Sequence, residues 1–142
     1  MNIKHFLKEE NWEKETEEAS FLLGNKLGDY IWLSEVPESR YQGWFISSAK
    51  NREKVYKIIE DIRPVNRNKV KDLENYFSRV VRKGDGFEEI LSLDEETSCF
   101  IYELKESGKV ELVLDMRESY SDDYPEYEIK NLDDKILIKA TN

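Results

Sequence analysis

The chain has 142 residues, 39% of them hydrophobic and 37% charged, with a formal net charge of −9. This length predicts one domain over residues 1–142, and three Trp, eight Tyr and six Phe supply apolar area for a core despite the high charge. The acidic balance repels phosphate backbones and argues against nucleic-acid binding through a broad basic surface.

The N-terminal segment, residues 1–18, is predicted to form an arm or a helix. Ile3, Phe6 and Leu7 recur at helical spacing, and a Glu/Lys-rich stretch that contains Trp12 follows. An irregular arm remains the alternative. The only histidine, His5, lies here, and we interpret it as incidental, because triad chemistry needs an ordered imidazole beside a nucleophile.

Most of the remaining chain is typical of short β-strands. The candidate segments are rich in aromatic and β-branched residues and are bounded by Gly, Asp, Asn and Ser. They are residues 20–23, 30–33, 44–47, 87–93, 99–104, 110–116, 127–129 and 135–140. Val110, Leu112 and Leu114 recur at the period of two that places one face of a strand on a core. The predicted fold class is therefore mainly β, an antiparallel β-sandwich, with one or two short helices left open.

Two further segments carry helix-like patterns. Residues 53–63 have apolar side chains at helical spacing and also at some even spacings, so that helix and strand both remain open. Residues 72–81 predict a short helix with Leu73, Phe77, Val80 and Val81 turned inward.

Three short polar segments predict tight connections. Residues 83–86, 106–109 and 131–134 are rich in Gly, Asp and Asn, which favour turns. We expect residues 106–109 to close a hairpin between the strands on either side.

The sequence provides no set of residues for a metal, a cofactor or catalysis. Cys99 is the only cysteine, and its apolar surroundings predict a buried small hydrophobe rather than a nucleophile. A single cysteine fits a reducing, cytoplasmic location. The acidic cluster of Asp122, Asp123, Glu126 and Glu128 lacks the order of an EF-hand loop. No apolar run is long enough for a membrane span or a signal peptide.

One stretch, residues 21–46, resembles a known family. It reads FLL over 21–23, NKLGDY over 25–30 and SRYQGWFI over 39–46. This order is similar to the opening pattern of the N-terminal β-domain of prokaryotic-type glycogen debranching enzymes (amylo-α-1,6-glucosidases). That pattern runs Trp-Leu-Leu, Asn-Gly-x-Gly-Gly-Tyr and Thr-Arg-Arg-Tyr-His-Gly. Lys26 and Asp29 stand in place of glycines, Gln42 in place of the His and Ser39 in place of the first Arg, so the resemblance is to a divergent and partial member.

The resemblance implies a function without catalysis by this chain. In the family, the domain is a large β-sandwich packed against an (α/α)₆ barrel that holds the catalytic carboxylates. The implied partners are such a helical barrel, in cis or in trans, and α-glucan. The resemblance also favours a strand over residues 53–63, which is the assignment we make.

Four residues are candidates for carbohydrate or interdomain contact: Arg40, Trp32, Tyr41 and Gln42. The two aromatic rings can stack on sugar rings, while Arg40, just before a Gly-bounded strand, favours anchoring of a loop. Trp44 lies within an apolar run, and we predict core packing for it. Two other functions stay open: a small acidic cytoplasmic protein-interaction module with no carbohydrate role, and, ranked last, a stand-alone enzyme.

Overall fold

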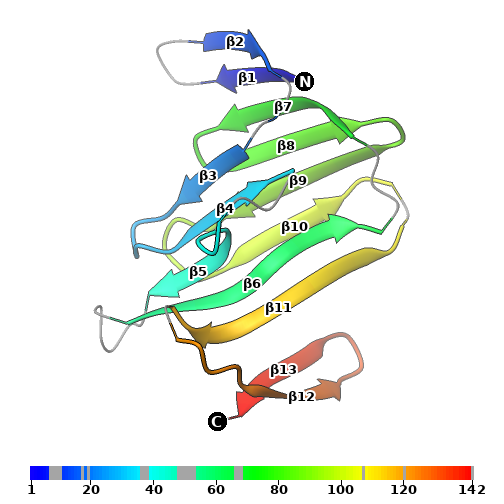
Figure 1. Cartoon of the computed structure of the whole chain (residues 1–142). Coiled ribbons are helices and arrows are strands. Elements are labelled where there is room, and N and C mark those ends of the chain that lie inside the picture. Colours follow the sequence, from blue (N-terminus) through cyan, green and yellow to red (C-terminus); the bar gives the residue numbers. More distant parts are fainter. Residues whose placement is uncertain are drawn as a thin grey trace.

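The computed structural model describes residues 1–6, 11–16, 18, 20–35, 39–47, 54–65, 69–106, 108–119 and 121–141. Every regular element in these residues is a β-strand (Figure 1). The strands are β1 (Asn2–Phe6), β2 (Asn11–Glu15), β3 (Ser20–Gly24), β4 (Tyr30–Ser34), β5 (Gly43–Ser47), β6 (Val55–Pro64), β7 (Val70–Tyr76), β8 (Arg79–Gly84), β9 (Phe87–Leu93), β10 (Phe100–Leu104), β11 (Val110–Glu118), β12 (Glu126–Asn131) and β13 (Ile136–Thr141).

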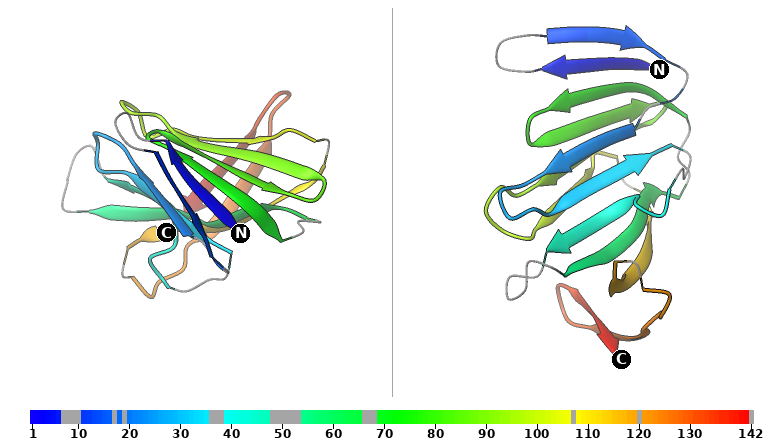
Figure 2. Two further views of the ribbon diagram at one scale, coloured as in Figure 1. Left: turned by 90° about the horizontal axis from the view of Figure 1, so that it is seen from above. Right: turned by 60° about the vertical axis from the view of Figure 1, so that its left-hand side comes forward.

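The strands form two large sheets and one separate hairpin. The six-stranded sheet has the order β10-β9-β8-β7-β1-β2, and the five-stranded sheet has the order β11-β6-β5-β4-β3. All neighbours pair antiparallel except β1 and β7, which pair parallel. Within the described part of the chain, β12 and β13 pair only with each other, and Figure 2 shows this C-terminal hairpin set apart from both sheets.

The core lies between the two large sheets. In Figure 1 the five-stranded sheet lies in front of the other, and β3 contacts both β8 and β9. Alternate residues of each strand face inward, as the period of two requires. The buried cluster comprises Phe21, Leu23, Ile31, Leu33 and Ile62 from one sheet and Leu73, Val80, Leu91 and Leu93 from the other. The predicted mainly-β sandwich is thus confirmed.

The helix predicted over residues 72–81 is wrong. These residues belong to β7 and β8, joined by a turn at residues 77–78. Leu73 and Val80 do face the core, but Phe77 lies in the turn with 82% of its surface exposed. The apparent helical spacing arises because the chain reverses direction between two inward-facing positions.

The N-terminal residues also form strands where a helix or arm was predicted. Ile3 lies opposite Leu73 in the parallel β1–β7 pair and packs against the core. Sheet pairing with a segment 70 positions away in the sequence outweighs the local spacing here. Leu7 lies outside the described residues.

The strand assigned to residues 53–63 is confirmed from Val55 onward, and residue 53 lies outside the described part. The mixed periodicity of β6 has a structural cause. Its pairing with β5 and with β11 shifts register, so that burial falls on Lys57 and Ile59 and then on Ile62 and Pro64. A β-bulge inserts an extra residue and changes which face the following side chains occupy.

Two of the three predicted turns are hairpins. Residues 83–86 join β8 to β9, and residues 131–134 join β12 to β13. The third prediction is wrong, because β10 pairs with β9 while β11 pairs with β6. The connection between them therefore crosses from one sheet to the other.

Candidate functional site

The loop over residues 39–42 is held in place by the buried side chain of Gln42. The Gln42 amide donates to the Ser34 hydroxyl at 2.8 Å, and its carbonyl oxygen accepts from the Ser39 amide at 3.3 Å. Next to it, Gly43 has φ +120°, and a Cβ there would lie 2.1 Å from the carbonyl oxygen of Ile59. Only glycine allows this close approach of β5 to β6.

The outer face of the five-stranded sheet, opposite the core, carries a second set of buried side chains. Phe45 is 2% exposed and stacks on Tyr30, with ring centroids 4.7 Å apart. Lys57 lies beside it on β6, with its ammonium 5.6 Å from the centre of the Phe45 ring. Aromatic faces attract cations, so Phe45 also supports the buried charge.

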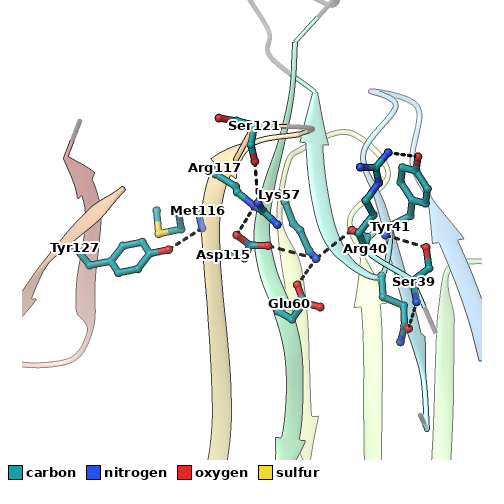
Figure 3. Close-up of polar contacts among 11 residues, drawn as sticks. Ser39, Arg40, Tyr41, Lys57, Glu60, Asp115, Met116, Arg117, Ser121 and Tyr127 are labelled. Atoms are coloured by element: carbon teal, nitrogen blue, oxygen red, sulfur yellow. Dashed lines mark hydrogen bonds and ion pairs between the residues drawn. The ribbon is translucent and has the colours of Figure 1, made fainter. Parts of the chain in front are cut away.

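The Lys57 ammonium is surrounded by acceptors. It lies 3.4 Å from Asp115 Oδ2, donates to the Arg40 carbonyl at 3.2 Å and pairs with Glu60 (Figure 3). An ammonium has three N–H donors, and these three partners account for them. Lys57 therefore ties the residue 39–42 loop to β6 and β11.

Arg117 extends this cluster toward the segment after β11. Its Nε lies 2.7 Å from Asp115 Oδ1, and its Nη1 donates to the Ser121 carbonyl at 2.8 Å (Figure 3). Its guanidinium carbon lies 4.5 Å from the centre of the Tyr124 ring. These contacts fix a planar cation against an aromatic ring that is itself 71% exposed.

A pocket of about 190 Å³ lies between the two loops. Two pairs of an arginine over a tyrosine ring border it, Arg117 with Tyr124 and Arg40 with Tyr41. The guanidinium carbon of Arg40 lies 5.1 Å from the centre of the Tyr41 ring. Arg40 also donates to the Tyr41 hydroxyl at 3.1 Å. Phe45, Lys57 and Asp122 are among the remaining lining residues. The pocket combines aromatic rings, N–H donors and a carboxylate acceptor.

The structure brings two of the four candidate residues to this pocket. Arg40 and Tyr41 line it, whereas Gln42 is a buried anchor of the loop beneath. Trp32 is half-buried on the same outer face as Tyr30, opposite Gly43 in the register, and is not part of the lining. Trp44 packs against the core and against Phe100, as predicted.

Sequence reasoning missed Lys57, Arg117 and Tyr124. A lysine within the apolar run of residues 55–59 was the one available signal, since a charged side chain in a buried strand requires partners. Arg117 and Tyr124 lie more than 70 positions after Arg40, and only the pairing of β11 with β6 brings them near. Tyr124 lies within the acidic cluster of residues 122–128, whose order does not match an EF-hand loop.

The prediction that Cys99 is buried is wrong. Its side chain is exposed, and it lies in the loop one residue before β10 begins at Phe100. The alternation of β10 turns Phe100 and Tyr102 toward the core, and the apolar run that suggested burial of Cys99 belongs to that strand.

Among the described residues, no group of three or more His, Cys, Asp or Glu side chains is placed to hold a metal ion. That part of the chain also has no helix with the length and apolar character needed to cross a membrane. Compared with family models, with curated proteins and with solved structures, the chain matches none.

Proposed function

We propose that this chain is a non-catalytic β-sandwich domain of a cytoplasmic, glycogen-debranching (amylo-α-1,6-glucosidase-like) glycoside hydrolase. In this role it scaffolds a helical catalytic barrel and contacts α-glucan through the outer pocket. The observation that carries the proposal is the position of Arg40 and Tyr41. These residues belong to the segment that resembles the family, and they border the pocket together with Arg117 and Tyr124.

The chemistry of the pocket suits a sugar residue. The Tyr41 and Tyr124 rings offer apolar faces to C–H groups, the guanidinium groups offer donors, and Asp122 offers an acceptor. A sugar hydroxyl both donates and accepts, so it uses all of these groups. A volume of about 190 Å³ is small among ligand sites and fits a single ring rather than a longer segment.

The charge balance favours a neutral ligand over an anion. Asp115 and Glu60 neutralise Lys57, and Asp115 also pairs with Arg117. An anion would therefore compete with carboxylates that are already in place, whereas a neutral polyol would not. The proposal leaves the hydrolytic carboxylates to the partner barrel.

The test is to titrate the purified chain with maltoheptaose and with panose, and to monitor binding by heteronuclear NMR. We expect shifts of residues around the pocket, and weaker binding by about tenfold for Tyr124→Ala or Arg40→Ala, which is the effect of losing about 1.4 kcal/mol. The matched control is Tyr76→Ala, because Tyr76 forms a similar stacked pair with Arg79, at 4.6 Å, on the other sheet. No binding by the wild-type chain, or equal losses in all three variants, would contradict the proposal.

A second candidate is a small acidic protein-interaction module with no carbohydrate role. The observation in its favour is the number of large apolar side chains exposed on the C-terminal hairpin, among them Ile129 at 61% and Ile136 at 64%. Failure to bind either saccharide, together with a stoichiometric partner protein that contains no glycosidase domain, would favour this candidate over the first.

A further inference from the structure

β11 is an edge strand of the five-stranded sheet, and part of its core-facing side is left exposed. Within the described residues β11 pairs only with β6. Leu112 lies opposite the core residue Ile62 and Val110 opposite the buried Pro64, so both side chains face the core side. They are nevertheless 43% and 41% exposed. An open edge with an apolar row is a template for pairing with another strand.

The backbone groups at this edge point outward. The Val65 amide donates to the Lys109 carbonyl, so Lys109 directs its carbonyl toward β6. Backbone direction alternates along an antiparallel strand, which turns the amide and carbonyl groups of Val110 and Leu112 away from β6. A neighbouring chain can therefore form a regular ladder here.

We propose that the occupant is a second copy of this chain, paired antiparallel through β11 about a two-fold axis at Leu112. Such an interface is isologous, with each copy contributing the same strand. It joins two five-stranded sheets into one continuous sheet. Leu112 then lies opposite its own symmetry mate, and Val110 lies opposite Leu114.

Among axes at residues 111 to 114, the charges along β11 favour this register. An axis at Glu111 would place Glu111 opposite its own mate, and an axis at Val113 would place Glu111 opposite Asp115. Like charges directly opposite one another destabilise a strand pair. An axis at Leu114 would require the Met116 amide, which already donates to the Tyr127 hydroxyl at 3.2 Å. Within residues 110–114, the axis at Leu112 creates no like-charge pair, and it leaves the contact with the hairpin outside the paired segment.

The net charge of −9 per chain gives the dimer a diagnostic salt dependence. Two acidic copies repel each other, and salt screens that repulsion while leaving apolar contacts in place. Dimerisation should therefore tighten as salt rises. A different partner attracted by the acidic surface would show the opposite trend. The proposal is independent of the glucan pocket, which lies on the other face of the sheet.

The decisive test uses the single cysteine. In a Cys99→Ser background, Leu112→Cys places two thiols opposite each other across the axis. A hydrogen-bonded antiparallel pair has a Cα separation of about 5.5 Å, within the range that a disulfide spans. We expect rapid formation of a disulfide-linked dimer under mild oxidation. Leu137→Cys in the same background is the matched control, because Leu137 is also an exposed leucine, at 52%, but lies on β13.

Light scattering provides an independent measurement. The wild-type chain should approach twice the 16.9 kDa of one copy as concentration and salt rise. Leu112→Lys places two like charges at the axis and should give single-chain mass under the same conditions, whereas Leu137→Lys should not. Single-chain mass for the wild type at its highest soluble concentration, or equal crosslinking of the Leu112→Cys and Leu137→Cys variants, would overturn the proposal.

Discussion

Arg82 Nε lies 2.8 Å from Glu89 Oε1 in the space between the two sheets, where the side chains are 3% and 0% exposed. The Tyr102 hydroxyl donates to Glu89 Oε2 at 2.8 Å, and the Arg82 guanidinium lies 5.6 Å from the centre of the Phe21 ring. This buried pair connects β8, β9 and β10 and reaches β3 in the facing sheet.

Loss of one partner of this pair should be far more costly than loss of both. Arg82→Met leaves the buried Glu89 carboxylate without its ion-pair partner, and Glu89→Leu does the same to the Arg82 guanidinium, so we expect each to lower the free energy of unfolding by about 3–5 kcal/mol. The double variant Arg82→Met/Glu89→Leu should recover most of that loss. Urea denaturation of the four proteins measures the cycle. Additive losses in the double variant would show that the two side chains do not act as a pair.

Gly43 should tolerate no side chain. Gly43→Ala would force its Cβ against the Ile59 carbonyl at a positive φ, so we expect a loss of more than about 3 kcal/mol or failure to fold. Gly86→Ala is the control, because Gly86 also has a positive φ, +76°, but open space around it. It should cost about 1 kcal/mol. Similar melting temperatures for the two variants would contradict the role assigned to close packing of β5 on β6.

The Glu74–Lys83 pair should make stability depend on pH in the acidic range. The hydrogen bond from Lys83, 2.9 Å long, holds the pKa of Glu74 below its ordinary value of 4.5. The unfolded chain then binds more protons than the folded one, so this contribution is complete above pH 4.5 and is lost as pH falls through the lowered pKa.

Glu74→Gln provides the measurement. Because Lys83 is partly exposed, we expect the variant to lose no more than about 1 kcal/mol at neutral pH. The difference between wild type and variant in chemical denaturation should then shrink toward zero in strong acid. A difference that stays constant across that range would assign the effect to packing rather than to charge.

Cys99 should react in the folded protein. Its exposed thiol predicts complete modification by a disulfide reagent such as DTNB without denaturant, with one thiol released per chain. Cys99→Ser should leave the free energy of unfolding within about 0.5 kcal/mol of wild type. Modification that requires denaturant would restore the original prediction of a buried side chain.

The sequence predicts best the strands in which inward-facing and outward-facing residues alternate without a bulge. Residues 20–23 and 30–33 alternate regularly, and both match strands of the fold. The β6 pattern was ambiguous because bulges change its phase, and the β7–β8 hairpin imitated a helix because its turn is short. The direction of the chain after residue 106 depends on which sheet has a free edge, which no local signal encodes.

The sequence allowed prediction of only the pocket residues that lie in the loop over residues 39–42. Arg40 and Tyr41 stand out beside a Gly-bounded aromatic strand. Arg117 and Tyr124 acquire their position through the long-range pairing of β11 with β6 and through Asp115, whose burial depends on Lys57. Such dependence of one buried charge on another is a property of the assembled sheet.

The parallel pairing of β1 with β7 determines the order in which the sheets can be completed during synthesis. Ile3 emerges from the ribosome before Leu73, and it has no partner strand on its β7 side until Leu73 has emerged. The six-stranded sheet can close only after Leu104, and the five-stranded sheet only after Glu118. Because contacts distant in sequence slow folding, the β1–β2 hairpin must wait for its β7 partner while the chain between Glu15 and Leu73 is made.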